Sequence, residues 1–278
     1  MSKNLRVGVG LVAYEISDIY IERLNSSLSG MDYCYKVVVD NSPNDKKRQL
    51  FESNDWLYIH SPDNPGFGRS HNHIFNLFGN KSDYHLILNP DIEFTSNILI
   101  ILEQWMDNNL DAGAVAPAVY YPDGVFQELR KLLPSPYGWF LRRFAKGTRL
   151  LLDYNYNFEL KMAPKNVVFK YPYMSGCFMF LRSNVIREIG LFDENIFMYC
   201  EDTDLSRRLW INNTPAYYNG GISIVHDFNK GSHKSLRLLF IAIKSTFYYF
   251  NKWGWFDSER NRINEECIRQ FYVDKKYF

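Results

Sequence analysis

The sequence predicts an α/β fold in which helices cover both faces of a doubly wound, mostly parallel sheet. In the first half of the 278 residues, short apolar runs alternate with polar stretches of helical length, as in strands joined by crossover helices. The apolar runs are continuous, which is typical of strands buried on both faces. Three of these runs end in polar clusters, and parallel strands bring their carboxyl ends to one edge of a sheet.

The individual elements follow from the apolar runs and the turn residues between them. Strands are expected over 5–12, 35–39, 57–60 and 84–88, and helices over 17–28 and 69–78. The second half is less regular. There we expect strands over 114–121, 178–181 and 222–225, a short helix capped by Ser183 and ended by Gly190, a helix over 204–211 entered through Glu201 and Asp202, and a basic, aromatic helix over 236–250.

Composition narrows the class of protein. Hydrophobic residues make up 46% of the chain, enough for a substantial core, and the net charge of +1 argues against a nucleic-acid binder. The four cysteines are widely spaced and form no C-x-x-C pair, which makes a zinc site or a dense disulfide framework unlikely on sequence grounds. The first residues resemble a strand more than a signal peptide, and no window of 18 apolar residues lacks charge. We therefore expect a cytoplasmic protein.

The polar clusters at the strand ends are the first candidates for a ligand site: Tyr14-Glu15, Asp40-Asn41 and Asn89-Pro90-Asp91. The Asp40 carboxylate can accept a hydrogen bond from the N3–H of uracil or thymine, or it can close an Asx-turn. Asp91 can supply one of the few carboxylates that Mg²⁺ or Mn²⁺ takes alongside substrate phosphates, or it can be a solvated residue of an Asn-Pro turn.

A glycine-containing loop, 64–68, precedes the helix that carries Arg69 and Asn72. Backbone N–H groups and a cation at a helix start suit a diphosphate, although two glycines in a connection can equally serve the turn alone.

The second group of candidates comes later in the chain. Glu201, Asp202 and Asp204 lie at the entry of one helix, where carboxylates are favoured electrostatically. They follow an apolar segment, so one of them can instead act as a general base whose pKa is raised by its neighbour. His226 ends a strand and is either a metal ligand or a structural histidine.

Taken in order, these segments resemble the family 2 inverting glycosyltransferases, in particular the rhamnosyltransferase-like branch that acts on bacterial surface polysaccharides. The pieces that carry the resemblance are Val12–Glu15, Val39–Ser42, Asn64–Arg69 with Asn72, Asn89–Asp91, Ser175–Cys177, Glu201–Leu205 with Arg208, and His226, over roughly residues 5–230. The usual D-x-D motif of the family is replaced by Asn89-Pro90-Asp91, which removes one carboxylate from the metal site. This variant recurs in the rhamnosyltransferase-like branch.

The resemblance implies a GT-A fold, a nucleoside-diphosphate sugar donor and a glycan or lipid-linked glycan acceptor. It implies a catalytic domain over 1–228, with a nucleotide-binding half (1–110) and an acceptor half (111–228), followed by a C-terminal annex (229–278). Carried over residue by residue, it implies a nucleotide-sugar site of Tyr14, Glu15, Asp40, Asn41, Arg69, Asn72, Asn89 and Asp91. It further implies Mg²⁺ or Mn²⁺ on Asp91 and His226, acceptor contacts at Ser175 and Gly176, and Asp202 as base beside Glu201.

Alternatives remain at this stage. A sugar nucleotidyltransferase shares the fold but needs a glycine-rich basic loop after the first strand, and Val12–Glu15 is not one. A non-catalytic subunit that binds carbohydrate or a lipid carrier needs no base, and a glycoside hydrolase does not explain the strand-end clusters. Two aromatic, basic segments, 137–149 and 236–255, can lie on an anionic membrane, in the core or in an oligomer interface. Peripheral attachment to the inner face of the cytoplasmic membrane is therefore one expectation.

Overall fold

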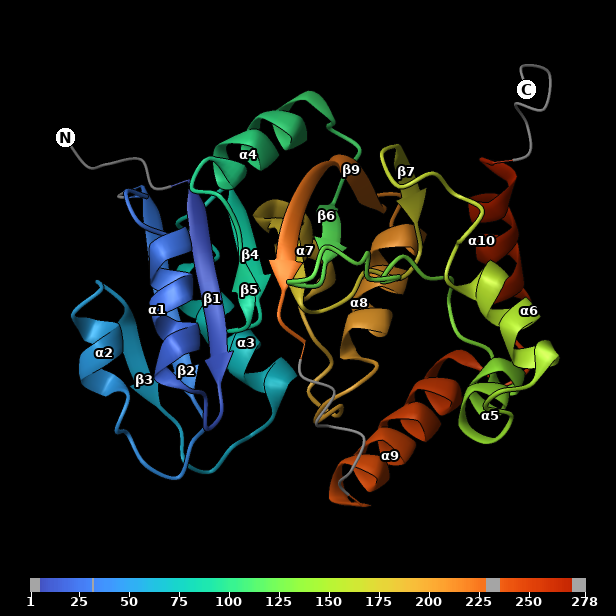
Figure 1. The fold of residues 1–278 in the computed structure, drawn as a ribbon, viewed down its shortest axis with the longest axis horizontal. Helices are drawn as coiled ribbons and strands as arrows, with labels where there is room; N and C mark the ends of the chain where they lie inside the picture. Colours follow the sequence, from blue (N-terminus) through green and yellow to red (C-terminus); the bar gives the residue numbers. More distant parts are fainter. Residues whose placement is uncertain (1–5, 32, 229–235, 272–278) are drawn as a thin grey trace.

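The computed structural model describes residues 6–31, 33–228 and 236–271. A nine-stranded sheet forms its centre, with the strand order β3-β2-β1-β4-β8-β6-β9-β5, and β7 pairs with β9 (Figure 1). The strands are β1 (Val7–Ala13), β2 (Cys34–Asp40), β3 (Leu57–His60), β4 (Tyr84–Leu88), β5 (Ile92–Glu93), β6 (Ala114–Tyr120), β7 (Val168–Tyr171), β8 (Phe178–Arg182) and β9 (Ala216–His226).

Helices flank the sheet on both sides and continue beyond it. They are α1 (Asp18–Ser27), α2 (Arg48–Glu52), α3 (Phe67–Phe78), α4 (Ile98–Asn108), α5 (Pro136–Phe144), α6 (Arg149–Phe158), α7 (Ser183–Ile189), α8 (Glu201–Ile211), α9 (Leu236–Trp253) and α10 (Ser258–Arg269). Helix α4 shows why such segments pack: Ile98, Leu102 and Met106 recur every four residues and are buried along one face.

The first half of the sheet is parallel, and the second half is mixed. Strands β1, β2, β3 and β4 run in one direction, whereas β8 enters antiparallel between β4 and β6. Figure 1 shows β1, β4 and β9 pointing toward the end of the molecule at which α9 lies. Because β8 runs the other way, its start meets the end of β4, and this places residues of the second half beside the predicted strand-end clusters.

The predicted α/β fold is confirmed, and most expected elements are present. Strands 57–60 and 84–88 have the predicted bounds, and the helix entered through Glu201 begins at that residue. Gly190 ends α7 with a positive φ of 77°, as expected, but the predicted cap is wrong: the N-cap residue is Arg182, and the Ser183 hydroxyl has no hydrogen-bond partner among the described residues. A serine inside the first turn faces the core here, where it is fully buried.

The C-terminal annex packs on the main domain. Its residues 229–235 and 272–278 lie outside the described part of the chain. In the described part, the Asn264 side chain of α10 donates to the carbonyl of Leu133 and accepts from its N–H. Buried Arg207 of α8 contacts Asp257, at 2.5 Å, in the turn between α9 and α10. The boundary near residue 228 therefore does not mark an independent unit in the packing.

Candidate active site

The sheet topology brings the predicted strand-end clusters together. Asn41 N–H donates to the carbonyl of Ala13 at 2.8 Å, and Glu15 N–H donates to the Ser42 hydroxyl at 2.8 Å, so the ends of β1 and β2 are joined. At the end of β4, Asn89 N–H donates to the carbonyl of Cys177 at 2.8 Å, because Leu88 is in register with Phe178 of β8. The edge thus gathers residues from both halves of the chain.

Asp91 and His226 face each other at this edge. Strand β5 pairs Ile92 with His226, and the Asp91 carbonyl accepts a hydrogen bond from the N–H of Asp227. These contacts hold the two segments side by side. Oδ1 of Asp91 lies 3.3 Å from Nε2 of His226. Both atoms are buried, and neither has a hydrogen-bond partner in the described structure.

Gln127 determines what His226 presents to Asp91. Its amide nitrogen donates to the backbone carbonyl of His226 at 2.7 Å, so its oxygen must be the atom 3.0 Å from Nδ1. Nδ1 therefore carries a hydrogen, and in the neutral ring Nε2 presents a lone pair toward the carboxylate. Two acceptors this close call for a proton or a cation between them, and an outer-sphere partner on Nδ1 is typical of metal-binding histidines.

Asp202 lies at the start of α8, close to the beginning of β8. Its Oδ2 accepts a hydrogen bond from Gly176 N–H at 3.1 Å, and its Oδ1 accepts from the Thr203 N–H at 2.7 Å and the Thr203 hydroxyl at 3.3 Å. Two consecutive residues before the helix, Tyr199 and Cys200, have φ values of 69° and 70°. Non-glycine residues rarely adopt this left-handed region, and such strain is concentrated at functional sites.

The two adjacent carboxyl groups differ in their surroundings. Burial raises the pKa of Glu201 well above its ordinary range, the neighbouring Asp202 raises it further, and its Oε2 has no partner within the described residues. Burial also raises the pKa of Asp202, but hydrogen bonds from Gly176 and Thr203 and the charge of Lys131 oppose this. The donated hydrogen bonds therefore favour the ionised form of Asp202 more than that of Glu201.

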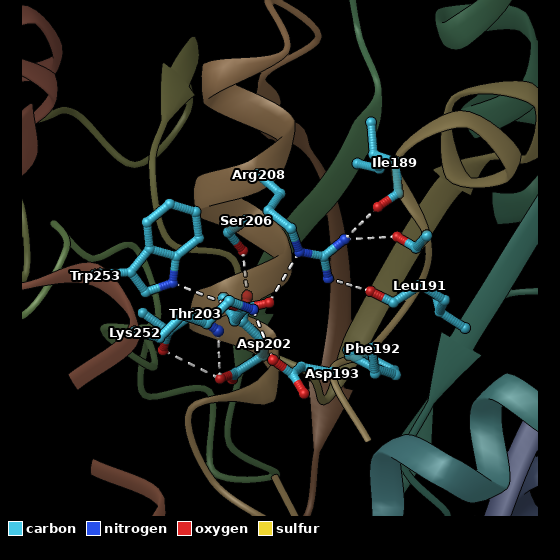
Figure 2. Close-up of polar contacts among 12 residues, drawn as sticks. Ile189, Leu191, Phe192, Asp193, Asp202, Thr203, Ser206, Arg208, Lys252 and Trp253 are labelled. Atoms are coloured by element: carbon cyan, nitrogen blue, oxygen red, sulfur yellow. Dashed lines mark hydrogen bonds and ion pairs between the residues drawn. The ribbon is translucent and has the colours of Figure 1, made fainter. Parts of the chain in front are cut away.

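The third acidic residue of this cluster has a structural role. Asp204 is fully buried and accepts hydrogen bonds from Nε of Arg208 and Nε1 of Trp253, both at 2.8 Å, while Nζ of Lys252 lies 2.7 Å away. Figure 2 shows these three side chains converging on the first turn of α8. Arg208 also donates to carbonyls of residues 189–191. Asp204 thus connects α8, the helix that carries Asp202, to two other parts of the protein. Trp253 and Lys252 link it to the annex, and Arg208 links it to residues 189–191.

Two residues that were predicted to bind the nucleotide, Asp40 and Asn41, have side chains that are hydrogen-bonded to other protein groups. Asp40 is 1% exposed, and its oxygens accept from the Tyr58 hydroxyl at 2.6 Å and from Ser42 N–H at 2.9 Å. The Asn41 amide exchanges hydrogen bonds with the Ser70 hydroxyl, in the reciprocal arrangement of two donors and acceptors 3.0–3.2 Å apart. Both side chains hold the loop in place, whereas Tyr14 and Glu15 beside them are exposed.

Arg69 and Asn72 also contact protein. The Asn72 amide donates to the Phe192 carbonyl at 2.9 Å and accepts from the Phe192 N–H at 2.9 Å, and Nε of Arg69 donates to the Glu194 carbonyl at 3.2 Å. Backbone N–H groups at the start of α3 were expected to suit a diphosphate. One of them, the N–H of Phe67, instead donates to the Phe197 carbonyl. Gly66 permits this contact: a Cβ there would lie 2.4 Å from that oxygen. These residues shape the loop over 192–197 next to the acidic pair.

Two residues at the site were not anticipated, Gln127 and Lys131. Both lie on the segment after β6, where Lys131 pairs its backbone with Tyr173, three residues before Gly176. Gln127 meets His226 across 99 residues of sequence.

Of the predicted acceptor residues, Gly176 contacts Asp202, and Ser175 lines a small cavity together with Gln127 and Cys177. Within the described ranges, no group of three or more His, Cys, Asp or Glu side chains is placed to hold a metal ion by itself.

Comparison with known proteins gives the site its context. No family model matches the chain. It is 25% identical to rhamnosyltransferase WbbL of Escherichia coli K12 over 240 residues, 83% of this chain and 87% of that protein. It is 26% identical to the low-salt glycan biosynthesis hexosyltransferase Agl10 of Haloferax volcanii, over 68% of this chain and 56% of that protein.

Solved structures show the same fold. The structure of GalNAc-T7 with UDP, GalNAc and Mn²⁺ superposes with a TM-score of 0.59 at 13% identity, over 82% of this chain and 44% of that one. The chain therefore spans less than half of that protein and just over half of the archaeal relative, while it matches most of the bacterial one. The chain is a glycosyltransferase of the GT-A fold, similar to a rhamnosyltransferase and to a hexosyltransferase of glycan biosynthesis.

Proposed function

We propose that this enzyme transfers a sugar, with inversion, from a nucleoside-diphosphate donor to a hydroxyl of a glycan or lipid-linked glycan. One observation carries the proposal: Asp202, the member of a buried carboxyl pair that accepts hydrogen bonds from Gly176 and Thr203, lies at the sheet edge where Asp91 faces His226. A base and a diphosphate-binding pair at the same edge are what in-line displacement at an anomeric carbon requires.

The chemistry of Asp202 follows from its hydrogen bonds. Thr203 donates twice to Oδ1, while Oδ2 accepts only from Gly176 in the described structure, so Oδ2 keeps a lone pair for an acceptor hydroxyl. The proton of that hydroxyl passes to Oδ2 as its oxygen bonds to the anomeric carbon. The bond from that carbon to the diphosphate breaks with its electrons on the diphosphate, and attack opposite the leaving group inverts the configuration.

We propose Asp91 and His226 as the protein ligands of Mg²⁺ or Mn²⁺. The two unpartnered acceptor atoms and the Gln127 hydrogen bond on Nδ1 fit such an ion, and the rest of the coordination would come from the donor phosphates and water. When bound, the ion supplies positive charge that stabilises the leaving diphosphate. The Mn²⁺ in the GalNAc-T7 structure supports this assignment.

We propose rhamnose from dTDP-L-rhamnose as the donor, on the basis of the WbbL similarity. Exposed Tyr14 and Glu15, with Asn89, would meet the base, ribose and phosphates. Asp40, Asn41, Arg69 and Asn72 were expected to touch the nucleotide, but their side chains are bonded to neighbouring loops. We therefore propose that these four position the loops around the donor. Ser175 and Gly176 would border the acceptor.

We also propose that exposed faces of α5 and α9 contact an anionic membrane. Helix α9 exposes Leu236, Phe240 and Phe247 along one face, with Arg237 and Lys244 beside them, and α5 exposes Tyr137, Phe140 and Phe144. Apolar stripes flanked by cations suit the interface of an anionic bilayer. None of the helices in the described ranges is long and apolar enough to cross a membrane. Cosedimentation with phosphatidylglycerol vesicles, but not with phosphatidylcholine vesicles, is the expected result.

The central test compares wild type with Asp202→Asn. The variant should bind donor normally, as read by the thermal shift with dTDP-rhamnose, and lose about 10²- to 10⁴-fold in transfer rate. Glu265→Gln, on an exposed face of α10, is the matched control and should transfer at the wild-type rate. An Asp202→Asn protein that folds, binds donor and transfers at a near wild-type rate would contradict the assignment. UDP- and GDP-sugars in the same thermal-shift screen test the donor, and donor synthesis or binding without transfer would favour the alternatives.

A further inference from the structure

The segment that follows β6 crosses both parts of the proposed site. Gln127 holds His226, and four residues later Lys131 pairs its backbone with Tyr173. Four residues span at most about 14 Å of extended chain. The backbone of Lys131 therefore lies within that distance of Gln127 and beside Tyr173, three residues before the Gly176 whose N–H is bonded to Asp202.

The Lys131 ammonium has no counter-ion among the residues with described positions. It lies over the Tyr173 ring, 5.2 Å from its centre, and has no hydrogen bond or ion pair to any residue that the structure describes. Burial lowers the pKa of Lys131, and nearby Arg142 lowers it further, whereas Asp202 acts in the opposite direction. Asp202 is thus near enough to influence the ammonium without pairing with it.

The other cations of this region already have partners. Arg142 pairs with Glu159 at 2.9 Å, and Arg130 pairs with Glu128 at 3.0 Å. A half-buried ammonium costs free energy unless an anion compensates it. If that anion were Asp202, the ion pair would occupy the lone pair that the base needs. An anion carried by a substrate would satisfy Lys131 and leave Asp202 accessible.

We propose that Lys131 binds a phosphate group of a substrate on the Asp202 side of the site. This inference rests on the proposed function, which supplies two phosphate sources: the diphosphate of the nucleotide donor and the phosphate of a lipid-linked acceptor. A compact, three-donor ammonium suits either one. In both cases the role of Lys131 is to hold the reacting groups beside Asp202.

Binding measurements with Lys131→Met test this directly. Calorimetric titrations would use dTDP with Mn²⁺ for the donor source and farnesyl diphosphate for the acceptor source, with farnesol as the uncharged comparison. Loss of a charge-assisted contact should weaken one of the two phosphate ligands by about 10- to 100-fold. The weakened ligand identifies the source, and farnesol affinity should not change.

Three further proteins complete the test. Lys131→Arg keeps the charge and should bind within a few-fold of wild type. Lys165→Met removes a cation that also lies over a ring, Phe126 at 4.9 Å, and should have no effect. Lys131→Gln replaces the methionine variant if the latter fails to fold by circular dichroism. Unchanged affinity for both phosphate ligands, or wild type that binds neither, would overturn the proposal. Lysine-dependent binding in an enzyme without transfer would contradict only the proposed function.

Discussion

Trp253→Phe tests whether the annex stabilises the helix that carries Asp202. The variant removes one hydrogen bond, from Nε1–H to the fully buried Asp204 carboxylate at 2.8 Å. It keeps an aromatic ring beneath the guanidinium of Arg207, which lies 4.2 Å from the indole centre. Hydrogen bonds to charged groups contribute about 1.5–3 kcal/mol, so the free energy of unfolding should fall by about that amount.

The assay is urea unfolding followed by circular dichroism, with Trp255→Phe as the matched control. Trp255 also donates one hydrogen bond at 2.8 Å, but its acceptor is the neutral amide of exposed Asn251. Its loss should cost no more than about 1 kcal/mol, since water can replace the partner. If Trp253→Phe lost no more stability than Trp255→Phe, the hydrogen bond from Trp253 to Asp204 would not stabilise the fold measurably, and the reasoning would be refuted.

Two further predictions concern the core and the metal pair. Burial lowers the pKa of His85 to about 4, whereas the unfolded imidazole takes up its proton near pH 6.5, so stability present at neutral pH is lost as pH falls. The free energy of unfolding should drop by about 2 kcal/mol between pH 7.5 and 5 from this group, and urea midpoints of His85→Leu should depend less on pH. Gln127→Leu should weaken Mn²⁺ binding in the presence of dTDP by about 10- to 100-fold, measured by the EPR signal of free Mn²⁺, while exposed Gln104→Leu should not. A full-strength Mn²⁺ site in Gln127→Leu would argue against His226 as a ligand.

Much of the fold could be predicted from the sequence because its strands are short apolar runs bounded by turns. Strands 57–60 and 84–88 are examples. The prediction placed the last strand only at 222–225, yet β9 begins at Ala216 and runs through Asn219-Gly220-Gly221. The glycine there serves close packing: a Cβ on Gly220 would lie 2.0 Å from the Lys165 carbonyl. Strand direction has no local signature either, so the reversal of β8 could not be anticipated.

The candidate site was predictable in position and less so in detail. Clusters at the ends of parallel strands must meet at one edge, and Asp91, Asp202 and His226 lie there as a consequence of topology. Which side chains face the ligand depends on contacts distant in sequence. Asn72 reads as a polar residue on a helix start, but its partner is Phe192, 120 residues away. Lys131 could not be identified from the sequence, because its segment has no hydrophobic periodicity. Its proposed role depends on Tyr173 and Asp202, which are distant in sequence.

The spacing of the acidic residues explains how one helix start serves two tasks. Residues two apart on an α-helix point about 200° apart, nearly to opposite sides. Asp202 therefore faces Gly176 and the site, while Asp204 faces Trp253 and Lys252 of the annex. The strained residues Tyr199 and Cys200 precede this turn, and a backbone held in an unfavourable region keeps that conformation only when its surroundings fix it. The Asp204 contacts provide such fixation, so loosening them should reduce the transfer rate at saturating donor as well as stability. The annex is, in this view, part of what positions the base.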